Sequence, residues 1–160
     1  MSERNLILAF DPGKTSGVCC VSHLSGRAFT ISASFEVQWQ DRFKIFNLIY
    51  VNKASIKSII IEEYRLFSNA LTLKSQIGSD IPSAQVIGII ELSAAICKLE
   101  KCIVFQRPSD IHYTNPQTRK LEYTVSIDPD HKKKLHSGQH CIDAFLHAKL
   151  YILSNHRKLK

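Results

Sequence analysis

Long hydrophobic runs are missing from this 160-residue sequence. The first apolar stretch covers only residues 5–10 before an aspartate follows, whereas a helix that spans a bilayer needs about 20 apolar residues. We therefore expect neither a membrane span nor a secretory signal. The protein is expected to be intracellular.

Cysteine is scarce and odd in number, with five residues and no Cys-x-x-Cys pair. This pattern disfavours both a zinc-ribbon site and a disulfide framework. Most of these cysteines lie in apolar runs, so we expect reduced thiols in the core of an intracellular protein. They are Cys19, Cys20, Cys97, Cys102 and Cys141.

Internal repeats, low-complexity tracts and domain linkers are also absent from the sequence. We expect one domain over residues 1–160, with a basic tail at about residues 155–160. A composition of 44% hydrophobic and 22% charged residues is ordinary for a globular chain. The net charge of +7 and the pI near 9.2 favour polyanionic partners, nucleic acid foremost.

The apolar pattern predicts an α/β fold. Three strands come first and form an antiparallel meander, and helices then alternate with short buried strands. This order favours a sheet of mixed direction with helices on its faces. We expect strands at residues 5–10, 16–22, 28–37, 58–61 and 102–106, and helices at residues 41–52, 83–99 and 136–154.

Three carboxylates stand where a hydrophobic core has no use for them. Asp11 and Glu62 end apolar strands, and Asp143 lies on the last predicted helix. A buried unpaired charge is costly and is usually paired or bound to metal. If the fold gathers the three, they form an oxygen cage for a divalent cation, which in a basic protein favours chemistry on phosphates. The alternatives are a simple turn at Asp11-Pro12-Gly13 and solvated carboxylates at the strand end.

Glu62 and Glu63 cannot both share a site with Asp11, because adjacent side chains on a strand face opposite ways. Glu62 directly follows three isoleucines and is the predicted ligand. Glu63 is expected to pair with a basic neighbour such as Arg65.

Four polar groups follow one stripe of the predicted helix at residues 136–154, with spacings of four, three and four. His140 and Asp143 offer a nitrogen and a carboxylate from adjacent turns. His136 is expected to meet substrate, and His147 to support a ligand or to pack.

The densest positive run is Lys132 to Lys134, just before that helix. It predicts contacts with backbone phosphates, although charge runs are often only a solvated helix start. Trp39, Tyr64 and Phe67 are candidates to stack on bases, with core packing as the alternative. Further candidates to bind DNA are Lys14, Arg65, Lys74 and His136, with Arg107, Arg119 and Lys120 as weaker ones.

Gly13-Lys14-Thr15 resembles the end of a phosphate-binding P-loop, but the required preceding glycine and the following helix are missing. A sugar-kinase or actin-like ATPase is a further alternative for the strand pair and its Asp-Pro-Gly turn. The length of the chain argues against it, since those enzymes need two such domains.

Together these motifs resemble the RuvC-type Holliday junction resolvases, most closely the short RuvC-like proteins of bacteriophages. The resemblance implies an RNase H-like fold, with a mixed five-stranded sheet and helices on both faces. It makes Asp11, Glu62 and Asp143 metal-binding carboxylates and places His140 at the family's fourth acidic position. The family's aromatic wedge falls on Tyr64 or Phe67. The segments that carry the likeness are residues 10–17, 60–67, 85–88 and 138–148.

The implied activity is a metal-dependent endonuclease that resolves four-way DNA junctions by paired nicks. Asp11, Glu62, His140 and Asp143 would be catalytic and would hold two Mg²⁺ or Mn²⁺ ions. A homodimer, with residues 83–99 at the interface, would supply two active sites. The alternatives are a broader flap or fork nuclease and a non-catalytic DNA-binding module. If the protein is viral, we expect it in the cytoplasm of a bacterial host.

Overall fold

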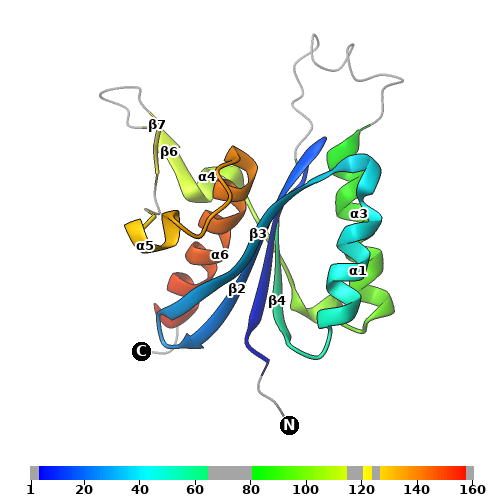
Figure 1. The fold of residues 1–160 in the computed structure, drawn as a ribbon, viewed down its shortest axis with the longest axis horizontal. Helices are drawn as coiled ribbons and strands as arrows, with labels where there is room; N and C mark the ends of the chain where they lie inside the picture. Colours follow the sequence, from blue (N-terminus) through cyan, green and yellow to red (C-terminus); the bar gives the residue numbers. More distant parts are fainter. Residues whose placement is uncertain (1–3, 65–80, 115–120, 124–126, 158–160) are drawn as a thin grey trace.

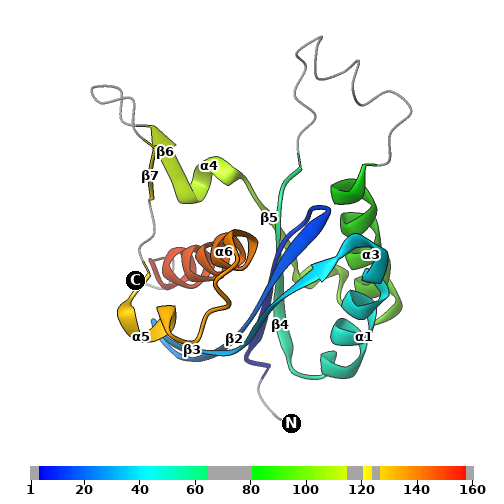
Figure 2. The same cartoon turned by 45° about the horizontal axis from the view of Figure 1, so that its top comes forward.

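A five-stranded sheet stands between two layers of helices (Figures 1 and 2). The computed structural model describes residues 4–64, 81–114, 121–123 and 127–157. The order of the strands is β3-β2-β1-β4-β5, which confirms the predicted mixed sheet. The strands are β1 (Leu6–Asp11), β2 (Thr15–Ser25), β3 (Ala28–Gln38), β4 (Ile56–Glu62) and β5 (Ile103–Gln106).

Strand direction changes at β1, the central strand. On one side β1, β2 and β3 pair antiparallel, as the predicted meander requires. On the other side β1, β4 and β5 pair parallel. Parallel neighbours end at the same edge of a sheet, so the carboxyl ends of β1, β4 and β5 lie side by side.

Helices cover both faces. The helices α1 (Phe43–Asn52) and α3 (Pro82–Ile96) lie together on one face, and α6 (Gln139–Arg157) lies on the other (Figures 1 and 2). Two short 3-10 turns precede α1 and β5. Between β5 and α6 come four short elements: α4 (Pro108–Ile111), β6 (His112–Thr114), β7 (Leu121–Tyr123) and α5 (Pro129–Lys132).

Two hydrophobic cores lie on the two faces of the sheet, and strand alternation assigns each residue to one of them. On β1, Leu8 and Phe10 pack under α1 and α3, whereas Ile7 and Ala9 pack under α6. Each fully buried leucine, isoleucine or phenylalanine side chain contributes about 1.5–3 kcal/mol to stability. The sheet is therefore packed on both faces, and the alternation of each strand decides on which face the side chains at its carboxyl edge lie.

The last helix begins later than the sequence pattern predicts. It starts at Gln139, and Ser137-Gly138 forms the turn before it. His136 therefore lies outside the helix, and the predicted stripe of four polar groups is wrong at its first member. The physical reason is Gly138, which is unfavourable inside a helix but suits the turn before one. At the other end α6 continues to Arg157, and residues 158–160 lie outside the described part.

All five cysteines are free thiols, as predicted. Cys19, Cys20 and Cys141 are buried. Burial raises the pKa of Cys20 to about 11 and raises those of Cys19 and Cys141, so these groups are protonated at neutral pH. Within the described residues, no helix is long and apolar enough to cross a membrane.

Candidate functional site

One row of residues crosses the whole sheet at the carboxyl ends of β1, β4 and β5. Glu36 pairs with Gly17, and Gly17 pairs with Asp11. The pairing of Phe10 with Ile61 places Asp11 beside Glu62, and Glu62 pairs with Gln106. The row therefore runs Glu36, Gly17, Asp11, Glu62, Gln106, with one residue from each strand.

The row lies on the face that α6 covers. Asp11 follows Ala9 at a spacing of two, and Glu62 follows Ile60 in the same way; both apolar residues belong to the core under α6. Glu63 faces the other side by the same alternation. The prediction that Glu62 rather than Glu63 shares the face of Asp11 is thus supported by the register of the sheet.

Helix α6 lays polar side chains over this row. The Nδ1 atom of His140 lies 2.6 Å from Oδ2 of Asp11. One turn further along the helix, Asp143 accepts a hydrogen bond from the side-chain amide of Gln139 at 2.9 Å. The electrostatic influence of Asp143 on Asp11 places the two carboxylates in one neighbourhood. Asp11 and His140 are therefore in contact, and Asp143 lies in their neighbourhood.

His147 on α6 contacts two members of the row, Glu62 and Gln106. Its ring is fully buried, and Nε2 lies 2.9 Å from Oε2 of Glu62 while Nδ1 lies 2.7 Å from Oε1 of Gln106. A carboxylate only accepts hydrogen bonds, so the nitrogen that faces Glu62 carries a proton. The imidazole therefore fixes the direction of Glu62.

The carboxyl group of Asp11 has a raised pKa. Burial raises its pKa to about 6, and the carboxylates of Glu62 and, more weakly, Asp143 add to the rise. The hydrogen bond from His140 opposes it. Each of these causes except the hydrogen bond disfavours the charged carboxylate. A cation among the oxygens would reverse the effect, so the donor set fits a hard divalent metal.

The turn after β1 keeps Asp11 in place. The hydroxyl of Ser16 donates to the carbonyl of Gly13 at 3.1 Å and accepts from the Gly13 N–H at 3.2 Å. Ser16 is fully buried. These contacts support the interpretation of Asp11-Pro12-Gly13 as a structural turn.

Gly17 lets α6 approach the sheet. A β-carbon at this position would collide with the backbone carbonyl of His140 and the backbone nitrogen of Cys141. The first turn of α6 thus rests on the backbone of β2. This contact sets the height of His140 and Asp143 above the row.

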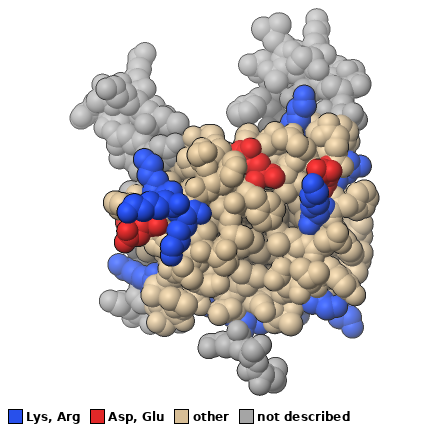
Figure 3. Space-filling model, in the orientation of Figure 1, with Lys and Arg blue, Asp and Glu red and all other residues tan. Residues whose placement is uncertain are grey.

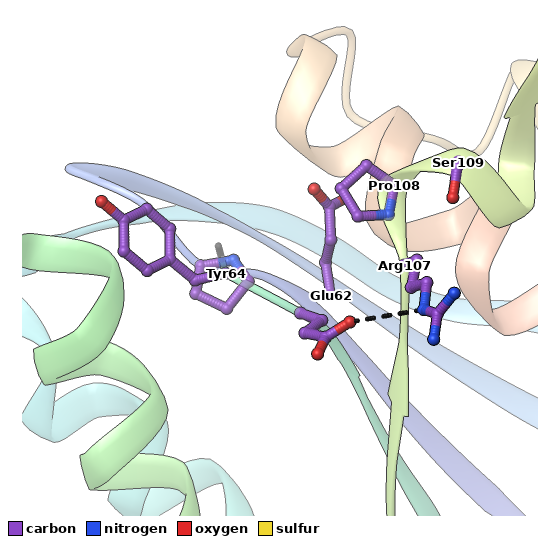
Figure 4. Close-up of a pocket in the computed structure, with 7 residues that line it drawn as sticks. Glu62, Tyr64, Arg107, Pro108 and Ser109 are labelled. Carbon is purple, nitrogen blue, oxygen red and sulfur yellow. Dashed lines mark ion pairs between the residues drawn. The ribbon is translucent and has the colours of Figure 1, made fainter. Parts of the chain in front are cut away.

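A pocket of about 310 Å³ opens beside Glu62 (Figure 4). Arg107 lies on its wall, and its Nε atom is 3.8 Å from a carboxylate oxygen of Glu63. Glu63 thus has a basic partner across the β4–β5 pair; Arg65, the partner named from the sequence, lies outside the described residues. The lining residues are Pro12, Glu62, Glu63, Tyr64, Arg107, Pro108 and Ser109.

The predicted DNA-binding residues fall into three groups. Lys14 and Lys132 to Lys134 are exposed, and Figure 3 shows basic side chains gathered over α5, with acidic side chains nearer the centre of the same face. Tyr64 lines the pocket. Arg65, Phe67, Lys74, Arg119 and Lys120 lie outside the described residues.

Three members of the row were missed by the sequence analysis: Glu36, Gly17 and Gln106. Gln106 could have been found from the sequence, because it is the last residue of β5 just as Glu62 is the last residue of β4. Gly17 carried no signal of its own, because only the packed helix shows why a side chain is excluded there.

No protein-family model and no curated protein matches the sequence. Among solved structures, RuvC of Thermus thermophilus in complex with a Holliday junction substrate matches with a TM-score of 0.65 at 10% identity, over 96% of each chain. The chain has the fold of the RuvC-type resolvases. The fowlpox virus Holliday junction resolvase matches with a TM-score of 0.57 at 12% identity, over 94% of this chain and 99% of that one. Likeness at such identities is one of fold, and it does not single out the bacteriophage proteins.

Proposed function

We propose that this protein is a metal-dependent endonuclease that cleaves branched DNA and resolves four-way junctions by paired nicks. The observation that carries the proposal is that α6 brings His140 and Asp143 over Asp11 and Glu62 at the ends of β1 and β4, in a chain with the RuvC-type fold. A fold alone does not assign a function, whereas half-buried carboxylates that raise the pKa of Asp11 at the edge of that fold mark a candidate functional site.

Asp11, Glu62 and Asp143 would hold the metal, with His140 as a nitrogen ligand. Carboxylate oxygens suit Mg²⁺, and the imidazole also suits Mn²⁺. A pair of such ions activates a water molecule and stabilises the leaving oxygen of a phosphodiester. The RuvC likeness is the reason for proposing two ions.

The chain's own groups divide the remaining work. Asp11 is central, because Glu62 and Asp143 both influence its charge. His147 and Gln106 hold Glu62 in one direction, so this ligand is positioned before DNA arrives. The Nδ1 atom of His140 lies 2.6 Å from Oδ2 of Asp11, so the two side chains are close enough to bind one metal ion.

DNA would approach the carboxyl edge of the sheet. Lys14 lies three residues after Asp11, and Lys132 to Lys134 precede α6, so both can contact phosphates beside the site. The pocket beside Glu62 has room for one nucleotide next to the scissile phosphate, with Tyr64 as the stacking surface. Arg107 on the pocket wall can bind a base or a phosphate once it leaves Glu63.

A homodimer would match the two-fold symmetry of a four-way junction. Large apolar side chains are exposed on α1 and α3, the face opposite the site, which supports an interface there. They are Phe43, Tyr50, Val51, Leu92 and Ile96. Two copies joined in this way would have two active sites and would cut two strands. We also propose that the protein works inside the cell.

The decisive experiment compares labelled four-way junctions, flaps, forks and duplexes as substrates, with Mg²⁺ or with EDTA. Metal-dependent, symmetric nicks in the junction support the proposal. Preferential cutting of flaps or forks would instead show a broader debranching nuclease, and tight junction binding without cleavage would show a binding module. Asp11→Asn and Asp143→Asn must each abolish cleavage while junction binding persists; cleavage at the native rate would refute the assignment of the site.

A further inference from the structure

A second group of metal-binding side chains lies on the same row of the sheet, on the other side of Gly17 from Asp11. Glu36 on β3, His136 before α6 and Cys141 on α6 each offer one ligand atom, and these atoms all lie within 4.8 Å of one another. Cys141 is buried, whereas His136 is exposed. None of the three takes part in the proposed carboxylate site.

Three separate segments are fixed around this group. The N–H of His136 donates to the hydroxyl of Ser34 on β3 at 3.3 Å. The carboxylate of Glu36 lies against the backbone of Gly138, in the space that a β-carbon at this position would occupy. The sulfur of Cys141 interacts with Ser34 and the Val18 backbone. The geometry is thus set by β3, the turn and the helix together.

We propose that Glu36, His136 and Cys141 form a binding site for Zn²⁺ or a similar borderline-soft cation, which fastens the start of α6 to β3. One thiolate, one imidazole and one carboxylate, with water in the fourth position, form a tetrahedral donor set that suits zinc. Magnesium prefers oxygen ligands alone. The two sites along the row therefore select different metals.

Metal binding requires small, defined changes. Zinc–ligand bonds of about 2.0–2.3 Å place tetrahedral donors about 3.5 Å apart, and the donor atoms lie within 4.8 Å of one another, so the side chains need to close by no more than about 1.3 Å. The Gly138 N–H also donates to Nδ1 of His136 at 3.1 Å. If zinc binds Nδ1, it occupies the lone pair that accepts this hydrogen bond. If zinc binds Nε2, the proton of the neutral ring must be on Nδ1, which then cannot accept. Either way this hydrogen bond breaks, and the Cys141 thiol loses its proton.

Metal binding at Cys141 should also affect the carboxylate site, because Cys141 directly follows His140 in the chain. An ion held by Cys141 and Glu36 would fix the helix turn that carries His140 above Asp11. The site is therefore a positioning device for α6. Its existence does not depend on the proposed nuclease function.

The test uses the reduced full-length protein, stripped of metal by a chelator and titrated with Co²⁺ as a coloured probe and with Zn²⁺. A thiolate-to-cobalt charge-transfer band should appear with one equivalent of Co²⁺. At a Zn²⁺ concentration a hundredfold above Kd, the melting temperature should rise by about 5–10 °C. The amide signal of Gly138 should shift when either metal binds.

Variants separate this site from the carboxylates. Cys141→Ser should lose the band, whereas Cys102→Ser, a thiol elsewhere in the fold, should keep it. His136→Asn changes an exposed side chain, so folding is not at stake, and it should weaken binding at least tenfold. The double variant Asp11→Asn/Asp143→Asn should keep the band and the melting shift. The absence of a band in the native protein, its survival in Cys141→Ser, or native affinity in His136→Asn would overturn the proposal.

Discussion

His140 and Asp11 are separated by 129 residues in sequence, yet Nδ1 of the one lies 2.6 Å from Oδ2 of the other. The contact joins the first turn of α6 to the end of the central strand. It also partly offsets the burial and repulsion that raise the pKa of Asp11. In the metal-free protein, burial and neighbouring carboxylates therefore disfavour the charged form of Asp11, while the contact with His140 favours it. Several measurable effects follow.

Replacing Asp11 by Asn should stabilise the metal-free protein at pH 8. The Asp11 pKa rises from 3.8 to about 6 on folding, so between these values the folded state binds more protons than the unfolded state. Stability due to this group is therefore highest below about pH 4, falls as pH rises to about 6, and stays reduced above that. At about 1.4 kcal/mol per pKa unit, Asp11→Asn gains at most about 3 kcal/mol. Urea unfolding in EDTA at pH 8 and pH 4 measures the gain, which should vanish at pH 4.

The exposed Asp41, which pairs with Lys44, provides the control. Asp41→Asn should give no gain in stability at either pH. Equal stability of Asp11→Asn and the native protein at pH 8 would show that Asp11 is not under the proposed charge repulsion.

Replacing His147 by Gln should weaken the metal site without weakening DNA binding. The flexible glutamine amide has no atom at the position of Nδ1, so the contact with Gln106 is lost and Glu62 no longer has a rigid partner that fixes its direction. Loss of such a supporting group typically costs 10–100-fold in metal affinity or activity. Cleavage measured over a range of Mg²⁺ concentrations should show this loss, while junction affinity in EDTA stays unchanged. His23→Gln, at the opposite end of β2, serves as the control; an equal loss there would exclude a specific role for His147.

Gly17→Ala should be among the most disruptive small substitutions in the protein. The added methyl group meets the backbone of α6 at His140, which has no rotamer to adopt. Overpacking of this kind costs about 1–3 kcal/mol or more, and the displaced helix also lowers cleavage. Chemical denaturation and junction cleavage check the two effects.

Gly88→Ala is a matched control, because a β-carbon at this position in α3 meets nothing within 4 Å. Alanine is favoured over glycine inside a helix by about 0.5–1 kcal/mol. The same chemical change should therefore stabilise the protein at residue 88 and destabilise it at residue 17. Tolerance of alanine at both positions would contradict the packing of α6 on β2.

Removing the charges of Lys132, Lys133 and Lys134 should weaken DNA binding and make it less salt-dependent. Each lost phosphate contact lowers the slope of log K against log salt by about 0.9. Three contacts would lower it by about 2.7. A triple alanine variant and a salt titration of junction affinity measure the change. The triple alanine variant of Lys53, Lys57 and Lys101 removes the same charge near the opposite edge of the sheet, and it should keep the native slope.

The sequence was most informative where alternation and strand ends decide the structure. Apolar runs predicted all five strands of the main sheet, and the alternation rule separated Glu62 from Glu63 before the register was known. The start of α6 was misplaced because helical spacing was counted through Gly138, although a glycine there favours a turn. Cys141 was predicted only as a core thiol. Its neighbours Glu36 and His136 come from distant segments, and no local pattern records their meeting.

The order of the elements along the chain has a consequence for synthesis. Strand β1 carries Asp11 and is made first, whereas α6 brings His140 and Asp143 and is made after every strand of the sheet. A nascent chain that has released β1 to β5 still lacks two of the four groups, and the apolar face under α6 is uncovered. Domains fold as units once their last segment emerges. Incomplete products should therefore be unable to cut DNA, and they should aggregate through the exposed sheet face.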